Sequence, residues 1–267
     1  MRLGDCCKTN LHTYSDKEKW SLIRYLDTGS ITEGRIDEIQ TLYPGVDKIP
    51  SRARRKASVG DILFSTVRPN QKHYGIIEAG TENLLVSTGF TVVTVDTTIA
   101  DPYFIYYYLT QSSVIESLQA IAEQSTSTYP SIKPSDIEDI ELDLPELETQ
   151  KKIGSTLRML DRKIALNEEI NDNLADLLQT IYQERFGNDI LAVNQGVLSD
   201  ICSYSRDKVA VSELNVRTYF STENMLSGKA GSTEATSLPT TSQTTACHKG
   251  DLSLIHISEP TRHAQIS

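Results

Sequence analysis

Two clusters of side chains have the chemistry needed to contact nucleic acid. The first is the segment TVRPNQK, residues 66–72, which supplies Arg68, Asn70, Gln71 and Lys72 in a turn expected just after an apolar strand. Arginine and lysine pair with guanine edges, and asparagine and glutamine pair with adenine edges. Their combination in one turn predicts base contacts. The alternative is a solvent-exposed hairpin turn with no partner.

The second cluster is the run SRARRK, residues 51–56, the densest basic run in the chain. Basic side chains in such a run hold phosphate groups more often than they read bases. We therefore expect phosphate contacts from Arg52, Arg54, Arg55 and Lys56, with a solvated turn as the alternative. The loop Gln124–Tyr129, with Lys133 beyond it, is a further candidate contact, and its alternative is a connector.

Catalytic chemistry is not indicated by the sequence. The tetrapeptide DPYF, residues 101–104, matches the Asp-Pro-Pro-Tyr motif of adenine methyltransferases only in part, and no glycine-rich cofactor loop precedes it. The five histidines and four cysteines fit no metal-ligand or nucleophile spacing. We therefore expect no metal and no cofactor in this chain. The tyrosines at 103 and 106–108 could stack on bases, but packing of a helix against a sheet explains them better.

The net charge of −10 argues against nucleic-acid binding, but the distribution of charge along the chain weakens this objection. Residues 1–75 carry 13 lysines and arginines against nine acidic residues, whereas residues 76–145 carry one against 11. A local basic face is what a nucleic-acid footprint needs. The sequence has no apolar run of 18 residues and no apolar secretory stretch at its start, which predicts a cytoplasmic protein without a membrane association.

Hydrophobic periodicity predicts a mixed α/β first segment. β-Branched runs bounded by glycines indicate strands, and a Ser-, Thr- and Pro-rich stretch indicates a loop. Asp101 is a suitable N-cap and Pro102 fits the first helical position. The predicted strands are 59–69, 76–77 and 84–96, the helices fall within 101–122, the loop is 123–140, and 141–150 is an extended piece leading into a helix.

A single long helix is predicted from Glu148 to Phe186, ended by Gly187. Its apolar residues alternate at spacings of four and three, which is a heptad seam of about four repeats and about 42 Å in length. Buried asparagines in a seam fix register and orientation at a cost in stability. Leu166, Ile170 and Leu177 widen the apolar face, so we expect the helix to pack on further elements. The predicted seam is Ile153, Leu157, Leu160, Ile164, Asn167, Asn171, Leu174, Leu178 and Ile181.

An internal repeat follows the helix. Residues 198–202, LSDIC, repeat residues 3–7, LGDCC, at an offset of 195. Residues 219–222 stand opposite 25–28, and KGDL at 249–252 repeats VGDI at 59–62. Each match is sparse, but their shared order predicts a domain, a long helix and the start of a similar domain.

The predicted organisation is an α+β chain in four parts. A mixed α/β domain at 1–147 is followed by a helical spacer at 148–187 and an incomplete second domain at 188–252. Residues 253–267 resemble neither copy, and LIHISEPTR resembles a translated sequencing adapter. We therefore expect a non-native tail and a second domain too short to bury a core of its own.

Several stretches together resemble the specificity subunit of type I restriction–modification enzymes. They are LGDCC, GDILFSTVRPN, STGFTVV and PSIKPSDIEDIELDLPELETQKKI, with YFSTENML and KGDL in the second copy. The resemblance implies target-recognition domains that each read half of a split DNA site, and helices that set the gap between the halves. It implies two methyltransferase subunits that use S-adenosylmethionine, and motor–nuclease subunits that use ATP and Mg²⁺. The chain itself is then non-catalytic.

Three hypotheses follow. The first is a DNA-recognition subunit that reads one half-site and scaffolds the methyltransferase and restriction subunits. The second is a half-size subunit that associates with a second copy through residues 148–186 and reads a palindromic split site. The third is a stand-alone methyltransferase, which would have to bind S-adenosylmethionine by itself. We expect the first.

Overall fold

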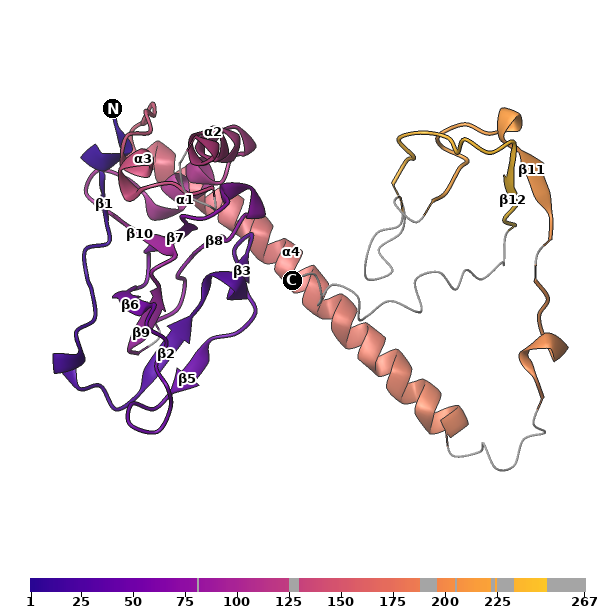
Figure 1. Cartoon of the computed structure of the whole chain (residues 1–267), viewed down its shortest axis with the longest axis horizontal. Helices are drawn as coiled ribbons and strands as arrows, with labels where there is room; N and C mark the ends of the chain where they lie inside the picture. The colour runs from indigo at the N-terminus through magenta and orange to yellow at the C-terminus, as the bar shows by residue number, and fades with distance from the viewer. Residues whose placement is uncertain are drawn as a thin grey trace. The chain divides into compact units, whose positions relative to one another are not determined.

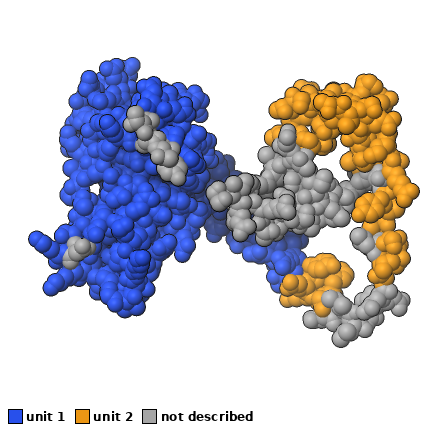
Figure 2. Space-filling model, viewed as in Figure 1, with its two compact units in different colours: residues 1–181 blue, residues 182–267 orange. Residues whose placement is uncertain are grey.

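The computed structural model of the chain describes residues 1–80, 82–124, 130–187, 196–204, 206–221, 224 and 233–248 (Figure 1). The predicted segments 249–252 and 253–267 lie outside the described residues. The chain forms two compact units, Met1–Ile181 and Tyr182–Ser267 (Figure 2). No helix in the described part of the chain has the length and apolarity needed to cross a membrane.

The first unit contains two four-stranded sheets. One is fully antiparallel, in the order β1 (Cys7–Thr9), β10 (Phe90–Val95), β7 (Ile62–Ser65) and β8 (Tyr74–Ile76). Every residue of β7 is buried, as its continuous apolar run requires. The predicted strands are confirmed in part: 59–69 contains the shorter β7, 76–77 overlaps the end of β8, and 84–96 is two strands separated by a turn at 88–89.

The second sheet has the order β5 (Gln40–Leu42), β2 (Ile23–Leu26), β9 (Leu84–Ser87) and β6 (Ala53–Lys56). Strands β2 and β9 are parallel, and the other two pairs are antiparallel. Most of the basic run 51–56 is therefore a strand rather than a turn. A small hairpin of β3 (Ile31–Thr32) and β4 (Arg35–Ile36) completes the strands of this unit.

The two sheets share a buried core. Side chains of β2 and β9 pack against those of β7 and β10, which joins the sheets through Leu26, Leu84, Val86, Leu63, Phe90 and Val92. The side chains that alternate with these on β2 and β9 form a separate cluster on the opposite face, with Ile23, Tyr25 and Leu85 buried beside Tyr14 and Ala53. This second cluster carries the hollow discussed below.

Three helices pack on the antiparallel sheet: α1 (Pro102–Leu109), α2 (Ser112–Glu123) and α3 (Pro134–Glu138). Asp101 caps α1, since its carboxylate accepts a hydrogen bond from the Phe104 amide at 2.9 Å. The predicted loop 123–140 was wrong over α3. Its proline occupies a first-turn position, and Asp136 accepts from the Lys133 amide at 2.7 Å, so a proline-containing segment starts a helix instead of remaining irregular.

The long helix α4 (Leu147–Tyr182) confirms the predicted helical segment, and a π-helical turn at Gln183–Gly187 follows it. Its first turns are fixed to the domain. Gln150 is buried and accepts a hydrogen bond from the Asp101 amide at 3.0 Å, while its amide group donates to carbonyls of Ile99 and Pro145. Gly154 lies against the start of α1.

Polar contacts continue this attachment further along α4. Arg158 donates to Glu78 at 3.0 Å and stacks over Tyr103 at 4.3 Å from the ring centre. Tyr107 donates to Asp161 at 2.7 Å. The tyrosine cluster thus packs α1 against its neighbours, as the sequence indicated, and the domain and the start of α4 form one body.

The predicted seam divides into two parts. Ile153 and Leu157 line a hollow of about 340 Å³ together with aromatic residues of α1. The later apolar members are more than 40% exposed in this chain: Leu160, Ile164, Leu174, Leu178 and Ile181. An apolar stripe of this length is therefore left without an intramolecular partner among the described residues.

The second unit contains a turn that repeats the start of the chain. The 3₁₀ turns Leu3–Asp5 and Leu198–Asp200 each end in an aspartate that caps its own turn. Asp5 accepts from the Arg2 amide and Asp200 from the Val197 amide, both at 2.8 Å. Further on, β11 (Lys208–Ala210) pairs antiparallel with β12 (Gln243–Thr245). The sequence repeat therefore coincides with a repeat of local structure.

Candidate nucleic-acid interface

The turn that carries the predicted base-reading residues is held in a specific shape. Residues Pro69–Gln71 form one 3₁₀ turn, and the residues on either side, Arg68 and Lys72, have left-handed backbones with φ of 48° and 57°. The Asn70 amide donates to the Gln119 side chain of α2 at 3.2 Å. Arg68, Asn70 and Gln71 are exposed. The turn therefore presents polar side chains from a fixed backbone.

The segment after residue 129 joins this turn. The Arg68 amide donates to the Pro130 carbonyl at 2.9 Å, and the Ile132 amide donates to the Thr66 carbonyl at 2.8 Å. These bonds bring Lys133, which is exposed, to the same end of the domain. Most of the candidate loop 124–129 lies outside the described residues.

Arg52 lies close to the same end. Thr66 donates to the Gly89 carbonyl through both its amide and its hydroxyl, at 2.8 and 2.9 Å. A side chain at Gly89 would stand 3.4 Å from the Arg52 guanidinium. Arg52 is exposed beside Gly89. Arg52, Arg68 and Lys133 come from three segments that are remote in sequence. The fold brings all three to the end of the domain that carries residues 66–68, just after β7.

The remaining basic candidates make contacts inside the protein. Arg55 donates to the Asn10 side chain at 2.6 Å and to the Phe90 carbonyl, and burial lowers its pKa. Lys56 pairs with Glu18 at 2.5 Å, and Lys72 pairs with Glu33. Arg54 is half-buried beside a hollow. DNA contacts from these four residues remain a prediction. Arg55, Lys56 and Lys72 already have partners within the protein, and Arg54 is partly buried.

The sequence reasoning missed the residues that hold these cations. Asn10 also accepts from the Val92 amide at 3.0 Å, so it joins Arg55 to the antiparallel sheet. Its positive φ of 51°, at the end of β1, is typical of asparagine in a tight turn, but the sequence gives no sign of its distant partner. Glu18 and Glu33 were likewise unmarked.

Other titratable side chains of the domain have structural surroundings. Within the described ranges, no group of three histidine, cysteine or acidic side chains is placed to hold a metal ion. Cys6 and Cys7 are buried neighbours whose sulfurs are 3.8 Å apart. Asp61 is buried and its pKa is raised by desolvation, but it is occupied by Thr94 and the Ser58 amide as a structural group.

Comparison with known proteins identifies the class of chain that carries this domain and helix. The family model for the type I restriction modification DNA specificity domain matches residues 12–176. This match covers most of the first domain and nearly all of α4. The chain belongs to this family, whose members are specificity subunits and not the catalytic subunits.

Relatives support the same placement. The specificity subunit of the type I restriction enzyme HindI from Haemophilus influenzae is 28% identical over 209 residues, which are 78% of this chain and 45% of that protein. The HsdS subunit from Thermoanaerobacter tengcongensis has a similar fold, with a TM-score of 0.54 and 22% identity over 80% of this chain and 53% of that one.

A further solved chain shows the same fold. It comes from work on complex assembly and conformational transition of a type I restriction–modification system, with a TM-score of 0.53 and 19% identity over 84% of this chain and 57% of that chain. The present chain spans about half the length of these relatives. The α+β class predicted from the sequence, a β-rich recognition domain followed by a long helix, is confirmed.

Proposed function

We propose that this chain reads one half of a split DNA site and carries the methyltransferase and restriction subunits that act there. The observation that supports this most directly is the firm attachment of one recognition domain to the base of a long helix. Such a domain has a defined position along the helix axis, which a split site requires. The helix seam of about 42 Å corresponds to about twelve base pairs.

DNA contact in this proposal comes from the end of the domain that gathers Arg52, Arg68 and Lys133. The 66–72 turn offers Arg68, Asn70 and Gln71 for base edges, and the basic residues around it suit phosphate. We assign the domain the range 1–147, the helical spacer 148–187 and an incomplete second domain 188–252. These boundaries are part of the proposal.

Partners supply the chemistry in this proposal. Two methyltransferase subunits bring S-adenosylmethionine, and the restriction subunits bring ATP and Mg²⁺, so this chain needs no cofactor. The exposed apolar stripe of α4 is a surface on which such subunits, or another helix, could pack. The complex would operate in the cytoplasm, where the DNA is.

The test is modified-base sequencing of the source genome with the gene present and with it deleted. We expect one split adenine-methylated motif to disappear on deletion, because only this chain would direct methylation to it. Restoration by the gene in trans is the control. An unchanged methylation pattern would argue against the proposal.

A second candidate function, a half-size subunit that pairs with another copy, is favoured by the charges of α4. Residues 147–165 carry five lysines and arginines against two acidic residues, and residues 166–186 carry one against five. An antiparallel pair of these helices sets the basic half of each against the acidic half of the other. The dimer would then present two identical domains to a palindromic split site.

Sedimentation of the full chain tests this candidate. Leu174, which is 51% exposed on the stripe, would be buried in such a pair, so Leu174→Asp should weaken association at least tenfold. The neighbouring Asn173→Asp adds the same charge off the seam and should leave association unchanged. A chain that remains monomeric at high concentration would exclude the dimer.

A further inference from the structure

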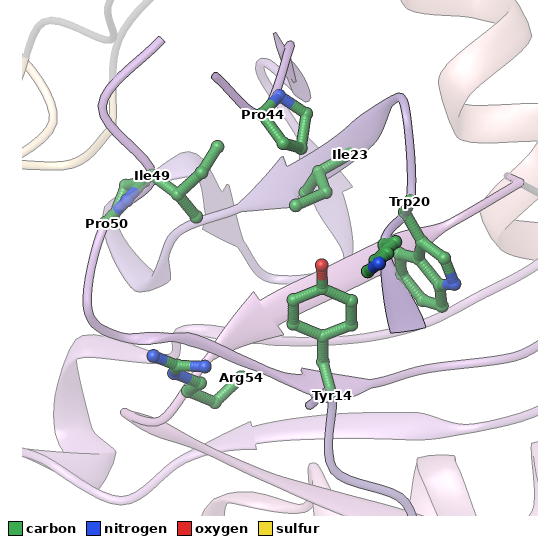
Figure 3. A pocket seen from close by; sticks show the side chains of 8 residues that line it. Tyr14, Trp20, Ile23, Pro44, Ile49, Pro50 and Arg54 are labelled. Atoms are coloured by element: carbon green, nitrogen blue, oxygen red, sulfur yellow. The ribbon is translucent and has the colours of Figure 1, made fainter. Parts of the chain in front are cut away.

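A hollow of about 410 Å³ opens on the face of the β5-β2-β9-β6 sheet that points away from the other sheet (Figure 3). Its volume lies within the range of roughly 300 to 1,000 Å³ that is typical of small-molecule sites. It combines aromatic, aliphatic and cationic side chains in one place. The lining residues are Tyr14, Lys19, Trp20, Ile23, Pro44, Ile49, Pro50 and Arg54.

The aromatic wall of the hollow is fixed in position. The rings of Tyr14 and Trp20 are 4.7 Å apart at an angle of 45°. The Lys56 ammonium lies 5.1 Å from the centre of the Trp20 ring and is itself held by Glu18. The Tyr14 amide donates to the Arg54 carbonyl at 2.7 Å, which attaches this wall to β6. Tyr14 is buried and Trp20 is half-buried, so a flat ring entering the hollow would meet mainly the indole of Trp20.

Two cations border the same space. Lys19 is exposed and has a left-handed backbone with φ of 48° and ψ of 46°. Such a conformation is uncommon for a residue other than glycine, asparagine or aspartate, and it is often associated with function. Arg54, on β6, contributes a guanidinium at the opposite side of Tyr14 from Trp20 (Figure 3). The hollow therefore combines an aromatic surface for stacking with two cationic side chains, Lys19 and Arg54, that can bind an anion.

We propose that this hollow binds an unstacked nucleotide, with its base against Trp20 and its phosphate on Lys19 and Arg54. Nucleobases stack on aromatic side chains irrespective of sequence. Phosphate oxygens accept charge-assisted hydrogen bonds from lysine and arginine. The nucleotide is either a free mononucleotide or one unit of a DNA strand, and the site shares only Arg54 with the interface predicted above.

Trp20 makes the site directly observable, because it is the only tryptophan of the chain. The full chain is titrated with dAMP, deoxyadenosine, deoxyribose 5-phosphate and a short single-stranded oligodeoxyadenylate while tryptophan fluorescence is followed. We expect dAMP or the strand to quench Trp20, with the nucleoside and the sugar phosphate at least tenfold weaker. Quenching by the strand without dAMP would identify DNA as the source, and quenching by both would identify a nucleotide site of general use.

A matched pair of variants tests the phosphate contact. Lys19→Gln should weaken binding roughly three- to tenfold, since one charge-assisted contact is lost at an exposed site. Lys17→Gln removes the same charge from the preceding 3₁₀ turn, outside the hollow, and should have no effect. Both variants are first shown to be folded by circular dichroism.

Two results would overturn the inference: no fluorescence response to dAMP or to the strand at millimolar concentration, or an equal loss of binding in the two variants. Neither result bears on the genomic methylation test. Duplex recognition can therefore stand if the nucleotide site fails, and the nucleotide site can stand if duplex recognition fails.

Discussion

Two physical arguments predict opposite effects on stability when Gly154 of α4 is replaced by alanine. Alanine is a better helix former than glycine by about 1 kcal/mol, so helix propensity alone predicts stabilisation. The packing predicts the reverse. A Cβ at this position would stand 2.5 Å from the Asp101 carboxylate, and 3.0 Å from both the Phe104 nitrogen and the Tyr103 Cβ.

The cost of this contact can be estimated from what must move. The Asp101 oxygen concerned is the one that caps α1, and the loss of a cap costs about 0.5–2 kcal/mol. Overpacking against the fixed backbone adds about 1–3 kcal/mol. After subtraction of the propensity gain of about 1 kcal/mol, Gly154→Ala should destabilise the first unit by about 0.5–4 kcal/mol. For a unit of this size, each kcal/mol lowers the melting temperature by about 2–4 °C, so it should fall by roughly 1–16 °C.

Thermal unfolding followed by circular dichroism measures this change, and hydrogen exchange at the Phe104 amide reports the cap directly. Ser155→Ala is the matched control, because Ser155 is exposed on the next position and should stay within about 0.5 kcal/mol of the parent. A Gly154→Ala variant that melts higher, with unchanged protection of Phe104, would refute the close packing of α4 on α1.

Three further outcomes are expected. Burial would raise the pKa of Glu78, but hydrogen bonding and charge from Arg158 outweigh it, so the pKa lies below its ordinary 4.5; the stabilisation is present above pH 4.5 and is lost as pH falls through the lower folded value. Because the pair is partly exposed, Glu78→Gln should remove about 1 kcal/mol or less at pH 7 and flatten the acid limb of thermal unfolding measured from pH 7 to pH 3. In duplex binding by the assembled complex, Arg68→Ala should reduce discrimination at one base position by about 1–3 kcal/mol. Lys133→Gln should weaken binding to all sequences alike and lower the salt dependence of log K by about 0.9. Identical effects of the two variants would contradict the division between base and phosphate contacts. If two α4 helices pair through the seam, Asn171→Leu should strengthen their association and permit both the parallel and the antiparallel orientation. Disulfide trapping of single-cysteine variants would detect the two orientations. A single orientation, unchanged from the parent, would exclude a register role for Asn171.

Local chemistry explains which parts of the fold were predictable. Asp101 followed by Pro102 is a strong local signal for the start of a helix, and the β-branched residues of β10 favour a strand. The long helix followed from its heptad spacing, in which Asn167 and Asn171 fill two seam positions, although α4 ends at Tyr182 and Gly187 lies in the π-helical turn beyond it. Each of these signals lies within a few residues of the structure that it specifies.

The structural contacts of the basic run could not be predicted, because its partners are remote. Arg55 finds Asn10 across 45 positions, and Lys72 finds Glu33 across 39. A sequence shows that a cation is present, but the fold decides whether an internal acceptor reaches it. The wall of the hollow has the same origin, since Tyr14 and Arg54 meet only through strand pairing. The proximity of Arg52 and Lys133 to residues 66–68 could not be predicted either, because these segments are remote in sequence.

The attachment of α4 to its domain makes the helix a lever with its pivot near Gly154. From there to Tyr182 the helix runs for about 42 Å at 1.5 Å per residue. A tilt of about 10° at the pivot would displace the far end by about 7 Å, which is about two base-pair steps of duplex DNA. The direction of the far part of the helix is therefore set near Gly154, where the lack of a side chain allows α4 to pack closely on α1.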